Sequence, residues 1–515
     1  MEQASGSAIA LNDDRAMNEY RAGQMLDLAN WAAAAFATFR RDDVLRIAEA
    51  AATAGAAKAE FYAEWAQRET GFGVVAHKAI KNRLCSTGIF ECYRDQDFVG
   101  FKVDPDRKIV AVPKPAGVIF ALVPSTNPIA TVFFKIILGL LTRNAIVMGA
   151  HPAAIGCCGD AVRTMAEAAE RAGAPKGIIQ IVPEANLDIV KAIMASPKID
   201  VILATGGTPM VRAAYSSGNP ALGVGPGNAP AYVDRSAKID RAAKCLADSK
   251  SFDNGILCTN ESAAIVDRQV AEPLRKALRK HGCHICDEAE RARLEDALFP
   301  LGKFNVGLLG KPAKEIAKAA DIRAAHGTRV IVAPLERIGD DYPLSREKLC
   351  PVLGLIEAPN WRAGLTAAKA MLRRVGVGHS AAVHAEDAEV ILRFGAELNV
   401  LRVAINTPCS TGAAGFDTHL APTMTIGTGF FGRSSVAENL RPDHLVNWTR
   451  IAYDKDAAVD FHSFEGLELN QPENDPIARL ADDEKPFDAN AAALREEIRA
   501  IIIEELREAI AGLKV

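Results

Sequence analysis

The stretch 251–261 contains a cysteine, a residue type that can form a covalent bond to a substrate. Cys258 follows Asn254-Gly255, a pair typical of turns, and precedes the apolar-rich run 262–266. A turn at this place could present the thiol to a cleft, and nearby amide dipoles that lower its pKa would make it a nucleophilic thiolate. A buried structural cysteine is the plainer interpretation of any single cysteine, so the rest of the chain has to decide between the two.

An ordinary composition and a nearly neutral charge exclude several classes of protein. The chain has 515 residues, which predicts two or three domains. Apolar residues make up 49% and charged residues 24%, as in globular proteins, and the net charge of −4 offers no basic field for nucleic acid. The ten cysteines are scattered and follow no secretory signal, so we expect a reducing cytoplasmic location. The most apolar region, 117–149, is interrupted by prolines and charges, which argues against a membrane span.

Alternating strands and helices predict an α/β fold class. Apolar strands are expected at 145–148, 177–182 and 200–204, each followed by turn residues and a helix. Near-continuous apolar strands of this kind are typical of a buried parallel sheet, whose ligands bind at the carboxyl ends of the strands, where helix N-termini favour phosphate. The Gly-rich stretch 223–227 leads into a strand rather than a helix, so it is not an ordinary dinucleotide fingerprint.

The N-terminal part of the chain differs in pattern from these units. Residues 1–11 look like a loose end, and 14–70 have a helical pattern rich in alanine. The segment 108–120 has two β-rich runs around Pro113 and Pro115, which predict a strand, a bend and a second strand.

Five motifs, in order and at matching spacing, resemble the aldehyde dehydrogenase superfamily. They are VPSTNP at 123–128, TGG at 205–207, GVGPGN at 223–228, FDNGILC at 252–258 and EKLCPV at 347–352. The greater similarity is to the CoA-acylating branch, which includes the aldehyde domain of the bifunctional aldehyde–alcohol dehydrogenases. The resemblance covers roughly residues 15–455.

The resemblance implies a Rossmann-like cofactor domain, an α/β catalytic domain and a β-hairpin oligomerisation arm that joins subunits into a dimer or tetramer. It also implies the aldehyde step alone, because the chain has no room for an iron-dependent alcohol dehydrogenase domain. The expected division is a cofactor-binding domain at 1–106 and 121–228, the hairpin at 107–120, a catalytic domain at 229–440, a return segment at 441–469, and a linker with an amphipathic helix at 470–515.

The resemblance also implies catalytic roles for two residues. Cys258 would attack the aldehyde carbonyl to form a thiohemiacetal. Asn127 would stabilise the alkoxide with its side-chain NH2, together with the Cys258 backbone N–H, and one such donor is worth about 3–4 kcal/mol of barrier. The alternative for Asn127 is a simple turn residue before Pro128.

NAD or NADP is the implied cofactor, to which hydride would pass. Glu347 would accept hydrogen bonds from the nicotinamide ribose, and its alternative is an exposed carboxylate beside Lys348. His151 stands where hydrolytic relatives have a lysine, which leaves NAD versus NADP open. The implied cofactor contacts are Leu122, Val123, Pro124, Ser125, Thr126, Asn127, His151, Gly207, Gly225 and Glu347.

Coenzyme A is the implied acyl acceptor. Hydrolytic relatives activate water with a glutamate 34 residues before the cysteine, and this chain has Val224 there. General-base help is worth about 10²–10⁴-fold, so hydrolysis should be slow, whereas a thiol needs less help. His379, in a Gly-Val-Gly-His motif at 376–379, is implied to orient or deprotonate that thiol, with a structural histidine beside the strand 380–383 as the alternative.

The predicted function is therefore an NAD(P)-dependent, CoA-acylating dehydrogenase of a short-chain aldehyde such as acetaldehyde or propionaldehyde. One alternative is an anionic aldehyde, succinate semialdehyde or sulfoacetaldehyde, held by Arg83, Lys135 or Arg402. Two others are a hydrolytic enzyme that releases the free acid and a catalytically dead scaffold.

Two further features have competing interpretations. Cys283-His-Ile-Cys286 lacks a second ligand pair at zinc-binding spacing, so we predict no metal there and a helix–strand joint at the surface instead. The terminal helix has an apolar stripe beyond the linker 470–489. It would dock on a neighbouring subunit, or recruit the enzyme to the protein shell of a bacterial microcompartment. Neither nucleic acid nor membrane is expected as a partner.

Overall fold

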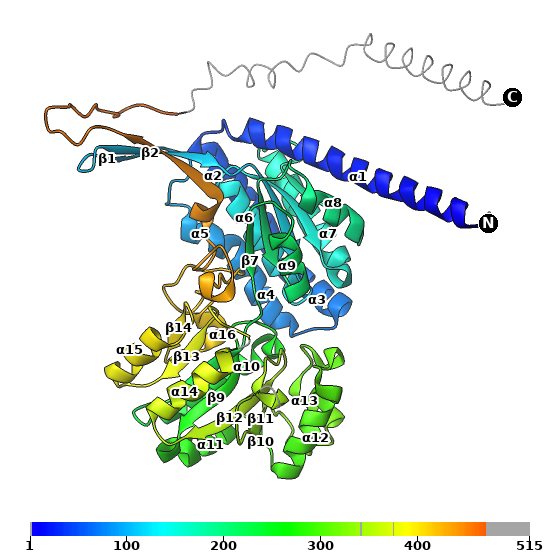
Figure 1. Cartoon of the computed structure of the whole chain (residues 1–515), viewed down its shortest axis with the longest axis vertical. Coiled ribbons are helices and arrows are strands. Elements are labelled where there is room, and N and C mark those ends of the chain that lie inside the picture. The colour runs from blue at the N-terminus through cyan, green and yellow to red at the C-terminus, as the bar shows by residue number, and fades with distance from the viewer. Residues whose placement is uncertain (1–2, 340–341, 374, 470–515) are drawn as a thin grey trace, which may run out of the picture. The chain divides into compact units, whose positions relative to one another are not determined.

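The computed structural model describes residues 3–339, 342–373 and 375–469 (Figure 1). The contacts of the chain divide it after Phe464, and the fold below is that of the part up to this residue. The predicted linker and terminal helix at 470–515 lie outside the described residues. No helix among the described residues is both long and apolar enough to cross a bilayer.

A five-stranded parallel sheet contains the three strands predicted from sequence and confirms them. The strand order is β5-β4-β3-β6-β7. Its members are β3 (Val118–Val123), β4 (Ala145–Ala150), β5 (Ile179–Ile181), β6 (Val201–Thr205) and β7 (Ala221–Val224). Around it, α1 packs along α8, and α2 packs on α6 and α7. These helices are α1 (Gln3–Phe36), α2 (Arg41–Ala57), α6 (Pro128–Leu141), α7 (Ile155–Arg171) and α8 (Leu187–Ala195).

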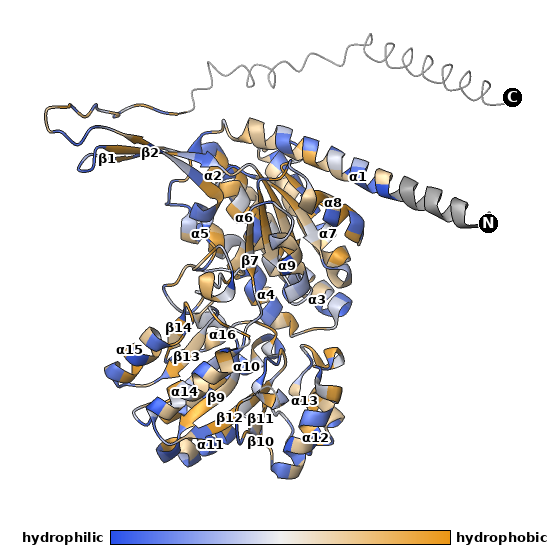
Figure 2. Ribbon diagram, viewed as in Figure 1, coloured by the Kyte–Doolittle hydropathy of each residue, from blue (hydrophilic) through white to orange (hydrophobic). Residues whose placement is uncertain are grey.

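The most apolar region of the sequence is the core of this sheet. It comprises β3, α6 and β4, and every residue of α6 is buried. A 14-residue helix is too short to span a bilayer, and here its apolar side chains are covered by protein on all sides. Figure 2 shows hydrophobic colour along the strands and hydrophilic colour on the outer faces of the surrounding helices.

A second parallel sheet, of seven strands, follows β7 in the chain. Its order is β10-β11-β12-β9-β8-β13-β14. The strands are β8 (Ala229–Val233), β9 (Glu261–Asp267), β10 (Cys283–Ile285), β11 (Val330–Pro334), β12 (Val352–Ala358), β13 (Ala381–His384) and β14 (Val403–Ile405). Its main helices are α10 (Ile239–Ser251), α11 (Ala271–Lys280), α12 (Glu288–Leu298), α13 (Ala313–Ala319), α14 (Trp361–Leu372) and α15 (Ala388–Glu397).

A three-stranded antiparallel sheet occupies the place of the expected arm (Figure 1). It consists of β1 (Lys102–Asp104), β2 (Ile109–Pro115) and β15 (Val446–Ala452). The expected hairpin bounds of 107–120 are wrong, because β1 precedes them and 118–120 belong to β3 in the five-stranded sheet. Gly117, with φ +126°, separates β2 from β3. The expected loose end at 1–11 is also wrong, since α1 begins at Gln3.

Alanine substitutions at two glycines should have opposite effects on stability. A Cβ at Gly117 would lie 2.1 Å from Asp200 Oδ2, and the positive φ disfavours any side chain, so Gly117→Ala should destabilise by about 1–3 kcal/mol. Gly139 lies within α6, where the nearest atom to an added Cβ is 3.8 Å away. Gly139→Ala should stabilise by about 0.5–1 kcal/mol. Thermal unfolding at a fixed scan rate measures both, and a lower Tm for Gly139→Ala would contradict this account.

Candidate active site

A cavity of about 430 Å³ lies at the carboxyl ends of the five-stranded sheet. Residues that end or follow all five of its strands line one wall, which is where parallel sheets bind ligands. The second wall comes from segments beyond β7 in the chain. The first wall includes 122–127, 149–152, 184–187, 205–207 and 224–226, and the second includes 256–259, Glu347, Leu349, Ala414, Thr423, Met424 and Ile426.

The cavity brings together every residue implied as a cofactor contact, together with Cys258. The exception among the predicted site residues is His379, which is not in its lining. The predicted residues that line the cavity are Leu122, Val123, Pro124, Ser125, Thr126, Asn127, His151, Gly207, Gly225, Cys258 and Glu347.

The loop before Cys258 is held in an unusual backbone conformation. Asp253, Asn254 and Gly255 have φ of 49°, 55° and 67°, and such left-handed geometry costs non-glycine residues roughly 1–2 kcal/mol each. Two side chains offset this cost. Asp253 accepts a hydrogen bond from the Val74 N–H at 2.6 Å, and Asn254 Nδ2 donates to a backbone carbonyl at 2.9 Å. The turn predicted at Asn254-Gly255 is therefore present, and its neighbour Asp253 takes part in it.

Asp253 is the centre of a buried ion cluster. Its carboxylate pairs with Lys78 and Lys81, both of which lie on α4 (Val75–Arg83) and are themselves buried. Burial alone would raise the pKa of Asp253, but the two lysines and the Val74 N–H outweigh it and lower the pKa. The carboxylate is thus ionised, and the cluster joins α4 to the loop that carries Cys258.

The Cys258 thiol lies against an apolar cluster that includes Val224, Ala414 and Ile426. Burial raises its pKa to about 12, and the negative charge of Glu347 adds to the rise. The expected lowering of the thiol pKa is therefore wrong, because burial and the Glu347 charge exceed the opposing effects of the backbone amide and of the Arg402 charge. The thiol is protonated at neutral pH, so catalysis requires a group that takes its proton.

Glu347 is a half-buried carboxyl group whose pKa is raised to about 7 by burial. Its Oε1 accepts the Gly227 N–H at 3.2 Å. The alternative of an exposed carboxylate is wrong, because Glu347 is half-buried. Its neighbour Lys348 is buried and donates to the carbonyls of Ser262, Leu344 and Arg346 instead. A carboxyl with such a pKa can exchange protons near neutral pH.

Asn127 is the N-cap residue of α6, makes no side-chain capping bond, and lines the cavity. Its backbone carbonyl accepts hydrogen bonds from the amide and hydroxyl groups of Thr131, at 3.1 and 2.7 Å. Its side-chain Oδ1 accepts from Lys81 Nζ. The position before Pro128 is therefore a helix N-terminus as well as a turn, and the side chain remains available to a ligand.

The helix α9 (Thr208–Tyr215) begins at the cavity, where Gly206 and Gly207 are lining residues. Gly207 is the N-cap of α9, and no side chain caps this N-terminus, whereas the neighbouring α8 is capped by Asn186. Open amide groups at a helix N-terminus bind phosphate. His151 follows β4 on the same side, and its Nδ1 accepts the Ala153 N–H at 3.1 Å.

His379 is buried outside the cavity lining. Its Nδ1 bonds to Ser380 Oγ at 2.9 Å, and burial together with the Arg402 charge lowers its pKa to about 3. A histidine with this pKa is a weak base at neutral pH. The structural alternative gains support, and the predicted role in handling the CoA thiol remains a prediction.

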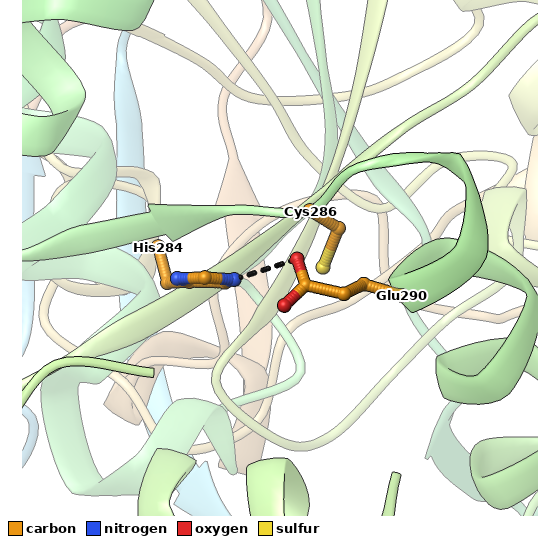
Figure 3. Close-up of side chains that lie close together, drawn as sticks. All are labelled: His284, Cys286 and Glu290. Atoms are coloured by element: carbon orange, nitrogen blue, oxygen red, sulfur yellow. Dashed lines mark hydrogen bonds and ion pairs between the residues drawn. The ribbon is translucent and has the colours of Figure 1, made fainter. Parts of the chain in front are cut away.

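The Cys283-x-x-Cys286 pair is divided between the two faces of its sheet. Cys283 packs in one core and Cys286 in another. Figure 3 shows Cys286 beside His284 and Glu290 instead. The Glu290 carboxylate is engaged already, because it accepts His284 Nε2 at 2.9 Å and the Asp287 N–H at 3.2 Å as part of the α12 capping box. The predicted joint between a strand and a helix is present, since β10 leads into α12. Its predicted place at the surface is wrong, because both cysteines are buried in the apolar cores.

Sequence reasoning missed Lys78, Lys81 and Asp253. The two lysines are three residues apart on a short helix, a spacing that places them on one face. Charged residues on one helix face are usually solvated, so burial of this pair could not be read from the spacing. The motif at 252–258 includes Asp253, but only the turn and the cysteine were predicted from it, and no role was predicted for Asp253.

Glu347→Gln should make Cys258 alkylate severalfold faster with iodoacetamide at pH 8. The substitution removes a negative charge that raises the thiol pKa, while the burial that raises it most remains. Mass spectrometry of the Cys258 peptide gives the rate. Glu184→Gln is the matched control, since Glu184 lines the same cavity but is not among the charges that act on this thiol. An equal rate in wild type and Glu347→Gln would contradict the prediction.

The sequence matches the aldehyde dehydrogenase family over residues 11–285. The chain is 34% identical over 423 residues to the bifunctional aldehyde-alcohol dehydrogenase AdhE of Escherichia coli K12, a match that covers 81% of this chain and 48% of that protein. It thus spans about half the length of such bifunctional relatives.

Two other relatives match over nearly their whole length. The succinate-semialdehyde dehydrogenase (acetylating) of Clostridium kluyveri is 36% identical over 404 residues, covering 78% of this chain and 89% of that protein. An acetylating aldehyde dehydrogenase from Geobacillus thermoglucosidasius has a crystal structure with a TM-score of 0.84 and 34% identity, covering 85% of this chain and 98% of that one. Together with the cavity and its cysteine, these matches show that the chain belongs to the aldehyde dehydrogenase family.

Proposed function

We propose that this protein is an NAD(P)-dependent, CoA-acylating aldehyde dehydrogenase that acts through a thioester on Cys258. The observation that carries the proposal is the position of Val224. This valine lines the cavity and packs in the same apolar cluster as Cys258, at the place where the hydrolytic enzymes that the sequence resembles have a glutamate. No base is available there to activate water.

The first step is attack of sulfur on the aldehyde. The Cys258 thiol gives up its proton, for which Glu347 is suited because its pKa lies near 7 and its charge acts on this thiol. The sulfur–carbon bond forms as the carbonyl π electrons move to oxygen. Asn127 Nδ2 and the Cys258 backbone N–H then donate to this oxyanion.

The second step oxidises the thiohemiacetal carbon to a thioester. The oxyanion reforms the carbonyl as hydride leaves the carbon, and a nicotinamide nucleotide bound in the cavity supplies the acceptor for that hydride. The loop 122–127 and the α9 N-terminus, both in the cavity lining, would hold the nucleotide. The apolar wall of Val224, Ala414 and Ile426 keeps this part of the cavity poor in groups that hold water.

The third step transfers the acyl group to CoA. The CoA thiolate attacks the thioester carbon, and Cys258 leaves as the thiolate or takes back its proton. Exchange between two sulfurs preserves the thioester and needs no strong base, unlike attack by water. Glu347 is the carboxyl whose charge acts on Cys258 among the described residues, and because it carries the Cys258 proton after the first step, it cannot also activate water.

The cavity favours a short apolar aldehyde over an anionic one. Among the described residues, no lysine or arginine lines it. Lys135 donates to the carbonyls at 122 and 203, Arg83 pairs with Glu60, and Arg402 donates to Asn439 and to the carbonyls at 379 and 427. The charge of Arg402 reaches Cys258, but its guanidinium is already hydrogen-bonded and no lysine or arginine of the described part of the chain lines the cavity, so acetaldehyde or propionaldehyde is the proposed substrate.

The proposal includes a homo-oligomer formed through the three-stranded sheet. In this sheet β15 pairs only with β2 among the described strands, so its other edge has no strand beside it. Open edges of this kind pair readily with another chain. A dimer or tetramer would cover the edge.

Reduction of NAD+ or NADP+ by acetaldehyde or propionaldehyde should require CoA. The absorbance of the reduced nucleotide measures the rate, and succinate semialdehyde and sulfoacetaldehyde should be slower substrates because the cavity holds no cation for them. Cys258→Ala should abolish activity, while Cys92→Ala, at an exposed thiol, should preserve it. Equal rates with and without CoA would identify a hydrolytic enzyme instead.

Val224→Glu should create CoA-independent oxidation. A carboxylate at this position can activate water against the Cys258 thioester, and such help is worth about 10²-fold or more. Val224→Gln is the matched control, since it has the same shape and cannot take a proton. The measurement is free acid formed without CoA, and equal acid from the two variants would contradict the role given to this position.

A further inference from the structure

The orientation of the Asn127 amide is fixed by Lys81. Lys81 is 1% exposed, and its Nζ donates to Asn127 Oδ1 and to Asp253 Oδ2. A lysine ammonium has donors and no acceptor, so the atom of the amide that faces it must be the oxygen. The Nδ2 group is therefore directed away from Lys81.

The rest of Asn127 is also anchored. Its backbone carbonyl accepts two hydrogen bonds from Thr131 in the first turn of α6. No described residue accepts a hydrogen bond from Nδ2, although the side chain lines the cavity that contains Cys258. The two amide hydrogens thus remain available to an oxygen atom bound in the cavity.

We propose that Lys81 is a positioning residue that presents the Asn127 amide to the oxyanion formed on Cys258. Its bond to Oδ1 sets the direction of the NH2 group, and its bond to Asp253 ties this donor to the loop that carries the nucleophile. The inference rests on the proposed function, because it needs an oxyanion at Cys258. It adds a residue on α4 that touches neither substrate nor cofactor.

Lys78 provides a matched control within the same ion cluster. It pairs with the same Asp253 oxygen at 3.2 Å, but its other hydrogen bond goes to the Thr126 carbonyl at 3.4 Å. Lys78→Met removes one positive charge from the cluster and leaves the bond to Asn127 Oδ1 in place. Lys81→Met removes one positive charge as well and also removes that bond. The difference in rate between the two variants therefore measures the contribution of the bond to Asn127 Oδ1.

The test is a double-mutant cycle on the full chain, read as single-turnover formation of reduced nucleotide. Asn127→Ala should slow this step about 10²–10³-fold. Lys81→Met should slow it by at least tenfold with little change in the KM for nucleotide, and adding it to Asn127→Ala should cause no further loss. Lys78→Met should slow the step less than Lys81→Met does. Lys81→Arg, which retains a donor, should keep most of the wild-type rate.

Multiplicative losses in the double variant would overturn the proposal, as would equal rates for Lys81→Met and Lys78→Met. If Lys81→Met does not fold by circular dichroism, Lys81→Leu, which also lacks a donor, takes its place in the cycle and the same criteria apply. Failure of the proposed function is distinguishable, because it would appear as full activity in Cys258→Ala or as CoA-independent turnover. An unaffected Asn127→Ala would overturn the oxyanion role and this inference together.

Discussion

A buried carboxylate, that of Asp253, is the constraint on which the candidate active site depends. An isolated charge in the protein interior costs several kcal/mol, so it must be paired and hydrogen-bonded. Here Lys78, Lys81 and the Val74 N–H supply the compensation. The carboxylate in turn holds a left-handed backbone conformation five residues before Cys258. The interactions that compensate the charge of Asp253 therefore also hold the loop before Cys258 in its left-handed conformation.

The same ion cluster connects the two segments that carry the proposed nucleophile, Cys258, and the proposed oxyanion donor, Asn127. Cys258 belongs to the loop between α10 and β9, whereas Asn127 belongs to the junction of β3 and α6. These segments are far apart in the sequence, and each contacts α4 through the lysines. The relative position of sulfur and amide thus depends on a helix that contributes nothing to the cavity lining.

Much of the cavity could be predicted, because its residues lie in motifs at strand ends. The strands at 145–148 and 200–204 have apolar runs that only a buried sheet accommodates, and Gly207 begins a helix directly after one of them. The rest depends on tertiary burial. The pKa of Cys258 rises because of what packs on it, and His379 matches a motif although its side chain lies outside the cavity lining. The hairpin bounds failed because Gly117 turns the chain between two sheets, which no local pattern showed.

The raised pKa of Cys258 has a consequence for the lifetime of the enzyme. Peroxide and similar oxidants attack the thiolate, and a protonated thiol with a half-buried sulfur reacts slowly with them. The apolar wall of Val224, Ala414 and Ile426 offers no group that could deprotonate water. The same wall helps to protect the Cys258 sulfur from oxidation to sulfenic acid. In the proposed mechanism Cys258 reacts only after a neighbouring group has accepted its proton. Slow oxidation of the thiol and preference for a sulfur acceptor over water would then depend on the same apolar contacts.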